Sequence, residues 1–129
     1  MNSELTYLAL ASVLTGLLWV PYVLNLILVR GVIDAVGYPE NPKPIAKWAA
    51  RLKAAHYNAV ENLVVFAVLV LVAQAAGIHS AAIASSAMVY FWARVVHAVA
   101  YTFAVPWIRT VAFVVGVGAQ LCIAWQILL

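Results

Sequence analysis

The segment HYNAVENLVVFAVLVLVAQAA, residues 56–76, joins a polar cluster directly to a long apolar run. Its first seven residues carry five polar side chains, among them the carboxylate of Glu61, and the apolar run extends from Leu63 to Ala76. Ionisable groups are costly at membrane depth, so they usually face a partner group or a ligand. The segment therefore predicts a helical membrane protein with a polar site between its helices.

The composition of the whole chain supports a membrane protein. Of the 129 residues, 67% are hydrophobic and only 9% are charged, whereas a soluble domain is about half apolar and about a quarter charged. So much apolar surface needs a bilayer as its solvent. The net charge of +3 does not form a continuous basic patch, so we expect no nucleic-acid partner. Cys122 is the only cysteine, which excludes an internal disulfide.

Four segments are long enough to cross a membrane, which takes about 20 mainly apolar residues. They cover about residues 5–29, 59–76, 81–103 and 107–128. The second is short, and we expect its helix to begin earlier, between Pro44 and Trp48, as an amphipathic extension. The sequence shows no internal repeat. The predicted fold is therefore an all-α integral membrane four-helix bundle, with residues 1–129 in a single domain.

Prolines and glycines mark the predicted breaks between and within these spans. Pro21 should kink the first span, with Asn25 one turn further on, and Arg30-Gly31 should end it. The stretch GYPENPKP, residues 37–44, predicts an irregular loop. The tight connection at residues 77–80 makes an antiparallel hairpin of the second and third spans.

The basic residues predict how the chain is oriented. Six of the seven Lys and Arg residues border the first or the third connection: Arg30, Lys43, Lys47, Arg51, Lys53 and Arg109. Lys and Arg are enriched in cytoplasmic loops, so we expect the first connection in the cytoplasm and both termini outside. The short chain and compact loops are typical of a bacterial protein, which favours the inner membrane.

Two polar stripes are expected to face each other across the predicted hairpin. The first recurs at spacings of four, three and four: Arg51, Ala55, Asn58 and Asn62. The second recurs at spacings of three and four: Arg94, His97 and Tyr101. Each set lies on one face of a helix. We expect Glu61, three residues after Asn58, to pair with Arg94, because an unpaired carboxylate at this depth is costly.

The pair between Glu61 and Arg94 could be structural and simply fix the register of two helices. The wider set near the same membrane face contains more polar groups than a register lock requires: Arg51, His56, Asn58, Tyr101 and Arg109. Such a set suits a small anionic, peptide-like ligand, because Arg binds carboxylates while Asn and Glu bind amides and amines. The sequence has no HExxH or CxxC pattern, so no metal site is expected. We expect His79, in the opposite turn, to face solvent.

Two strings resemble signatures of the MAPEG superfamily, the membrane-associated proteins in eicosanoid and glutathione metabolism. RLKAAHYNAVEN, residues 51–62, resembles the signature of the second helix. ARVVHAVAY, residues 93–101, followed by Pro106 and Arg109, resembles the signature of the third helix and the following loop. The chain looks most like the microsomal glutathione transferase and prostaglandin E synthase branch, because His97 stands where the leukotriene synthase branch has a tyrosine.

The resemblance implies a homotrimer among membrane lipids, with glutathione bound between neighbouring subunits near the cytoplasmic face. A lipophilic substrate would enter from the bilayer. By position, the resemblance assigns glutathione binding to Arg30, Arg51, His56, Asn58, Glu61, Arg94 and Tyr101. It assigns stabilisation of the glutathione thiolate to Arg109. A thiol with an ordinary pKa of about 8.5 becomes a better nucleophile at neutral pH when a cation stabilises its thiolate.

The function implied is a glutathione transferase or peroxidase that detoxifies lipophilic electrophiles or lipid hydroperoxides. Two other functions are compatible with the sequence. The first is a non-catalytic membrane binding or scaffold protein of the same fold, because Ala54 stands where the family usually has an arginine. The second is a small transporter or channel subunit, which intramembrane Arg94 and Glu61 permit. The sequence lacks the inverted repeat that transporters often show.

Overall fold

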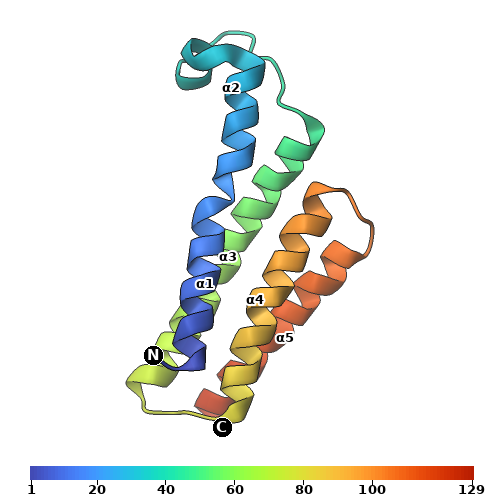
Figure 1. Cartoon of the computed structure of the whole chain (residues 1–129). Coiled ribbons are helices and arrows are strands. Elements are labelled where there is room, and N and C mark those ends of the chain that lie inside the picture. Colours follow the sequence, from blue (N-terminus) through green and yellow to red (C-terminus); the bar gives the residue numbers. More distant parts are fainter.

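The apolar segments form five helices in the computed structural model, which describes all residues from 1 to 129 (Figure 1). They are α1 (Ser3–Leu17), α2 (Trp19–Val36), α3 (Lys47–Ala75), α4 (Ala81–Thr102) and α5 (Ile108–Leu128). Because α2 continues α1 in nearly the same direction, the two form a single membrane-length span, and the chain has four such spans. The predicted all-α four-helix membrane bundle is confirmed.

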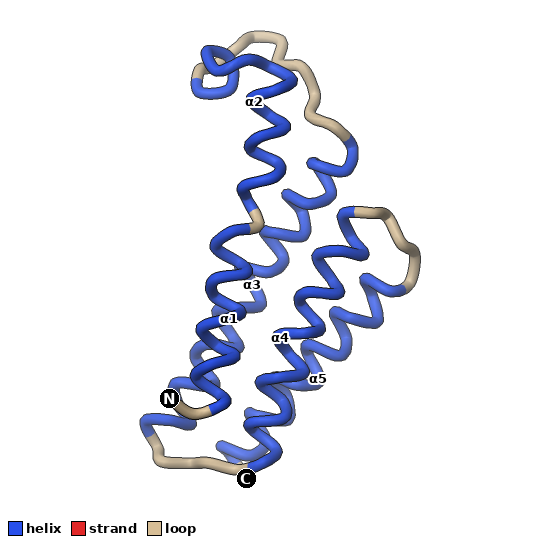
Figure 2. The backbone as a smooth tube through the Cα atoms, in the orientation of Figure 1, coloured by secondary structure: helices blue, strands red, loops and turns tan.

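The first span is interrupted at Leu18, as Figure 2 shows by the short loop between α1 and α2. Proline has no N–H donor, and its ring crowds the carbonyl four residues earlier. For Pro21 that carbonyl belongs to Leu17, which is where α1 ends. The predicted effect of Pro21 is seen as a local break in the helix, at the position that follows from the missing hydrogen bond, without a large change of direction.

The first span ends at Arg30-Gly31, as predicted. Gly31 has φ 77° and ψ 162°, which is not a helical conformation and is open to glycine because it has no Cβ. A short helical stretch, which the sequence did not predict, follows Gly31 and completes α2 at Val36. Figure 1 shows this last part of α2 lying across the end of the bundle.

The second predicted helix begins at Lys47, inside the expected range of residues 44–48. The Ala46 N–H, just before it, donates to Asn25 Oδ1 of α2 at 2.9 Å. Further out, Arg30 Nε donates to the carbonyl of Lys43 at 2.7 Å. Side chains of α2 therefore fix the loop that leads into α3.

Helix α4 packs against α1, α3 and α5, and its contact with α5 is the most extensive between any two helices. The rings of Phe66 on α3 and Tyr90 on α4 are fully buried and stacked, with centroids 3.9 Å apart. Gly116 of α5 faces the same helix: a Cβ built on it would lie 3.9 Å from Ala93 Cβ and from the Tyr90 ring. Small residues at this contact let α4 and α5 pack closely.

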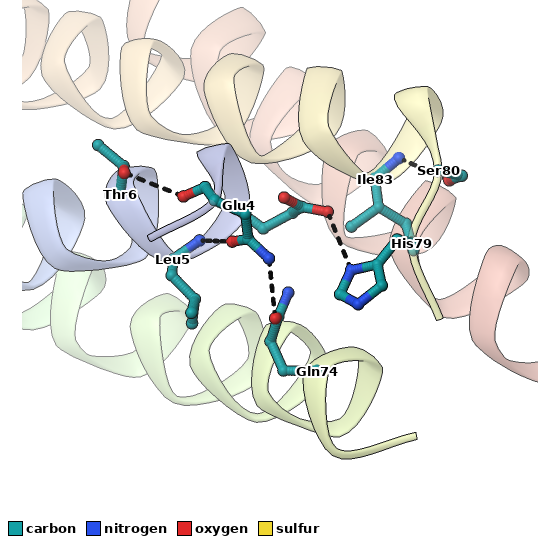
Figure 3. Close-up of polar contacts among 8 residues, drawn as sticks. Glu4, Leu5, Thr6, Gln74, His79, Ser80 and Ile83 are labelled. Atoms are coloured by element: carbon teal, nitrogen blue, oxygen red, sulfur yellow. Dashed lines mark hydrogen bonds and ion pairs between the residues drawn. The ribbon is translucent and has the colours of Figure 1, made fainter. Parts of the chain in front are cut away.

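The two ends of the bundle differ in charge. The α2–α3 and α4–α5 connections lie at one end, and both termini and the α3–α4 turn lie at the other (Figure 1). At the terminal end, Asn2 Nδ2 donates to Gln74 Oε1 at 2.9 Å. Glu4 is buried, with Oε1 3.9 Å from Nδ1 of His79 (Figure 3). His79 is exposed, as predicted, and contacts a carboxylate that the sequence reading did not anticipate.

The α4–α5 contact leads to a prediction about Gly116. Gly116→Ala should be neutral or stabilising by up to about 1 kcal/mol, because alanine has the higher helix propensity and its Cβ meets only ordinary contacts. Gly116→Leu should destabilise by about 1–3 kcal/mol, because the larger side chain overpacks the contact. Thermal unfolding in detergent, followed by circular dichroism, would measure both. Equal stability of the two variants would contradict this packing.

Candidate functional site

Arg94 is the most deeply buried cation of the chain, with 4% of its surface exposed. Its Nη2 donates to Asn58 Oδ1 of α3 at 2.7 Å and to His97 Nδ1 of α4 at 3.3 Å. The spacing of three residues places Arg94 and His97 on the same face of α4. The two predicted polar stripes therefore do meet between α3 and α4.

The predicted ion pair between Glu61 and Arg94 is absent, and this expectation was wrong. Glu61 is exposed and forms no ion pair, while Asn58 occupies the position next to the guanidinium. Three residues along a helix with 3.6 residues per turn leave Glu61 rotated about 60° from Asn58. That rotation directs the carboxylate away from the α3–α4 contact, and a neutral amide oxygen accepts the hydrogen bond.

The polar contacts continue from Asn58 towards α5. Asn62 Nδ2 donates to the carbonyl of Asn58 at 2.9 Å, and Gln120 Nε2 donates to the carbonyl of Asn62 at 3.1 Å. The sequence reading missed Gln120, which is buried. The sequence does carry a signal for Gln120, because a polar glutamine inside an apolar span usually faces a partner. Its spacing of four residues from Gly116 places both residues on the same face of the helix.

Two further arginines lie at the same end of the bundle. Arg51 Nε donates to the carbonyl of Thr102, at the end of α4, at 2.9 Å. The guanidinium carbon of Arg109 lies 4.4 Å from the centroid of the Tyr101 ring, within the range of a cation–π contact. The Tyr101 ring also meets His97 edge-on, with centroids 5.7 Å apart. Tyr101 thus connects Arg109 to the group around Arg94.

Two neighbouring cavities open between these side chains. A cavity of about 220 Å³ is lined by Arg51, Ala100, Tyr101, Ala104, Val105, Pro106, Trp107 and Arg109. A cavity of about 290 Å³ is lined by Asn58, His97, Tyr101, Arg109, Thr110 and Phe113. Because Tyr101 and Arg109 line both, the two cavities form one polar region. Thr110 and Phe113 carried no signal in the sequence.

His56 and Arg30, two of the predicted site residues, do not join this region within one chain. The ring Nδ1 of His56 hydrogen-bonds to the hydroxyl of Tyr22 on α2 at 2.7 Å, a partner that the sequence reading missed. Arg30 bonds the loop carbonyl of Lys43 and is exposed to solvent at the guanidinium. Both lie towards the basic end of the bundle, but neither lines the two cavities.

The region has positive charge without a counter-charge. The only contact between a basic side chain and a carboxylate within 4 Å joins His79 and Glu4 at the opposite end, so Arg51, Arg94 and Arg109 pair with no carboxylate. The buried Nε of Arg94 has no hydrogen-bond partner. A buried cation is costly unless it is paired and hydrogen-bonded. The arrangement is therefore suited to binding an anion.

One family model, described as the MAPEG family, matches residues 7–129. No curated protein and no solved structure matches the chain. The resemblance seen in residues 51–62 and 93–101 is thereby confirmed over nearly the whole chain.

The contact between Asn58 and Arg94 leads to a prediction about stability. Asn58→Ala should cost about 1–3 kcal/mol, because it removes an acceptor from a buried guanidinium. Adding Arg94→Met should recover part of that loss, because the buried charge is then gone. Thermal unfolding in detergent would measure both, with the exposed Ser85→Ala as control. An Asn58→Ala variant as stable as Ser85→Ala would contradict the prediction.

Proposed function

Because the chain belongs to the MAPEG family, which includes glutathione transferases and related membrane proteins, we propose that it is a membrane-embedded glutathione transferase or peroxidase. Its substrates would be lipophilic electrophiles or lipid hydroperoxides that arrive from the bilayer. Four apolar spans and the family make it an integral membrane protein.

The observation that carries this proposal is the set of arginines without carboxylate partners. Arg51 and Arg109 line two adjoining cavities, and the buried Arg94 lies behind Asn58 and His97, which line the second cavity. No acidic side chain of the chain pairs with any of the three arginines. A purely structural role for Arg94 would be better served by a carboxylate partner. An anionic ligand in these cavities would supply the missing negative charge.

The chemistry of the region fits glutathione, which carries two carboxylates, an amine and two amides. Arg51 and Arg94 would hold carboxylates, since guanidinium groups bind them with strong, charge-assisted hydrogen bonds. Asn58 and the exposed Glu61 would meet amide and amine groups, and Tyr101 would donate its hydroxyl. In the homotrimer that we also propose, Arg30 and His56 would reach the ligand from the adjoining subunit.

Arg109 would stabilise the glutathione thiolate. Bound glutathione would supply its thiolate as the nucleophile. Arg109 is held against the Tyr101 ring at the boundary of the two cavities, where its charge would favour the thiolate over the thiol.

A non-catalytic membrane binding protein is the second candidate. Ala54, on the turn of α3 between Arg51 and Asn58, offers no basic group where the family usually has an arginine. Calorimetric titration with glutathione separates the two candidates, because the non-catalytic one predicts no binding heat.

We also propose that the protein lies in a bacterial inner membrane with both termini outside the cytoplasm. This proposal rests on the basic residues that border the α2–α3 and α4–α5 connections at one end of the bundle.

The orientation predicts the behaviour of reporter fusions in bacterial cells. Alkaline phosphatase, which needs the periplasm, should be active when fused after Leu129 and inactive when fused after Asn41 in the α2–α3 loop. A green fluorescent protein at the same two points should give the opposite pattern. Active phosphatase at Asn41 would show that the orientation is reversed.

The proposed chemistry predicts activity in a direct assay. The purified protein in detergent should conjugate glutathione to 1-chloro-2,4-dinitrobenzene, and Arg109→Ala should lower kcat/KM by about 100-fold, the scale for losing one charge-stabilising group. Lys53→Ala serves as the matched control, because Lys53 is a basic residue at the same end that lines neither cavity.

The controls distinguish a specific role of Arg109 from a general loss of activity. Equal loss in Arg109→Ala and Lys53→Ala would argue against a specific role for Arg109. No conjugation and no peroxidase activity in the natural protein, together with no binding heat for glutathione, would overturn the transferase proposal in favour of the non-catalytic candidate.

A further inference from the structure

The connection between α4 and α5 contains two residues in the left-handed region, and neither is glycine. Ala104 has φ 54° and Trp107 has φ 70°. Residues with a Cβ adopt positive φ uncommonly, and for a bulky side chain such a value is an outlier. Both residues line the cavity that also contains Arg51 and Arg109. Each therefore calls for a local explanation.

The end of α4 explains Ala104. The N–H of Val105 donates to the carbonyl of Ala100 at 2.9 Å, and the N–H of Ala104 donates to the carbonyl of Tyr101 at 3.3 Å. This pair of bonds is the Schellman motif, which requires one left-handed residue just after the helix. Alanine here occupies the position that glycine most often fills.

Trp107 has no such explanation from a helix end. The N–H of Ile108 donates to the carbonyl of Pro106 at 2.8 Å, across Trp107 alone. With φ 70° and ψ −40°, this is the rare and strained form of the γ-turn. The Trp107 side chain is 80% exposed, so burial of the indole does not hold the backbone in this form.

The turn at Trp107 is joined directly to the first turn of α5. The Trp107 carbonyl accepts from the N–H of Val111 at 2.9 Å, which ties the turn to the start of the helix. Arg109 is two residues further on, with its guanidinium against Tyr101. The direction in which α5 starts, and with it the origin of the Arg109 side chain, therefore depends on the backbone of Trp107.

We infer that Trp107 is a positioning residue, whose left-handed turn sets the first turn of α5 so that Arg109 lies against Tyr101 at the boundary of the two cavities. The inference rests on the proposed role of Arg109 in stabilising a thiolate. Strained backbone is found preferentially at functional sites, where the surrounding structure maintains it. In this chain the strained residue, Trp107, lies two residues before Arg109, which is proposed to stabilise the thiolate.

Two substitutions of modest and similar size test the inference. Asparagine accepts left-handed φ several-fold more readily than most residues, whereas β-branched valine resists it. Trp107→Asn should therefore keep the turn without the indole, and Trp107→Val should lose both. Trp125→Leu, which removes an exposed indole from the far end of α5, is the matched control.

The first readout is the ultraviolet difference absorbance of the thiolate when glutathione is added, together with kcat and KM. Trp107→Val should lower the thiolate signal and kcat by roughly tenfold or more, because misplacing a catalytic group is costly, with a smaller change in KM for glutathione. Trp125→Leu should stay within about twofold of the natural protein, and Trp107→Asn should keep a clearly larger thiolate signal and kcat than Trp107→Val, because it keeps the turn. Equal losses in Trp107→Asn and Trp107→Val would overturn the inference.

The second readout does not depend on glutathione. Hydrogen–deuterium exchange, measured by mass spectrometry, should be faster over residues 108–112 in Trp107→Val than in Trp107→Asn, because the turn no longer holds the start of α5. Equal exchange in the two variants would overturn the inference. A natural protein without a thiolate signal would overturn the proposed function, whereas a normal signal that Trp107→Val leaves unchanged would overturn only the positioning role.

Discussion

The charge of Arg94, buried among apolar helices, is the constraint on which the polar region depends. A cation at this depth needs hydrogen-bond acceptors or a counter-charge. Asn58 and His97 provide acceptors, but neither side chain carries a negative charge, so the positive charge of Arg94 is not cancelled. Arg51 and Arg109 add to it. The packing of α3 on α4 therefore creates a region that favours an anion, and the proposed function follows from this excess of charge.

The same packing requires small residues where the helices approach most closely. Gly116 lets α5 come near Ala93 and the aliphatic part of Arg94 on α4. That approach allows Gln120 to bond the backbone of α3 and brings Arg109 to Tyr101. The packing of α5 on α4 therefore also sets the geometry of the site, because a shift of α5 would move Arg109.

Several features of the fold were predictable because each has a local cause. The span lengths follow from apolar runs, and the break at Leu18 follows from the missing N–H of Pro21. The end of the first span at Gly31 follows from the freedom of glycine to adopt a non-helical conformation, whereas the short helical stretch after it was not predicted. Glu61 was misassigned because a difference of about 60° around a helix decides whether a side chain faces a neighbour, and the spacing of one helix does not show where that neighbour lies.

The sequence by itself determined that this is a four-span membrane protein of the MAPEG family, because apolar length and the motifs at residues 51–62 and 93–101 are properties of local sequence. It also placed Arg51, Asn58, Arg94 and Tyr101 on two helix faces that could meet. Only the tertiary structure decided that Asn58, and not Glu61, contacts Arg94, and that Trp107 begins α5 in a left-handed turn. Those outcomes depend on the relative rotation of helices and on the closure of a loop, which long-range packing fixes.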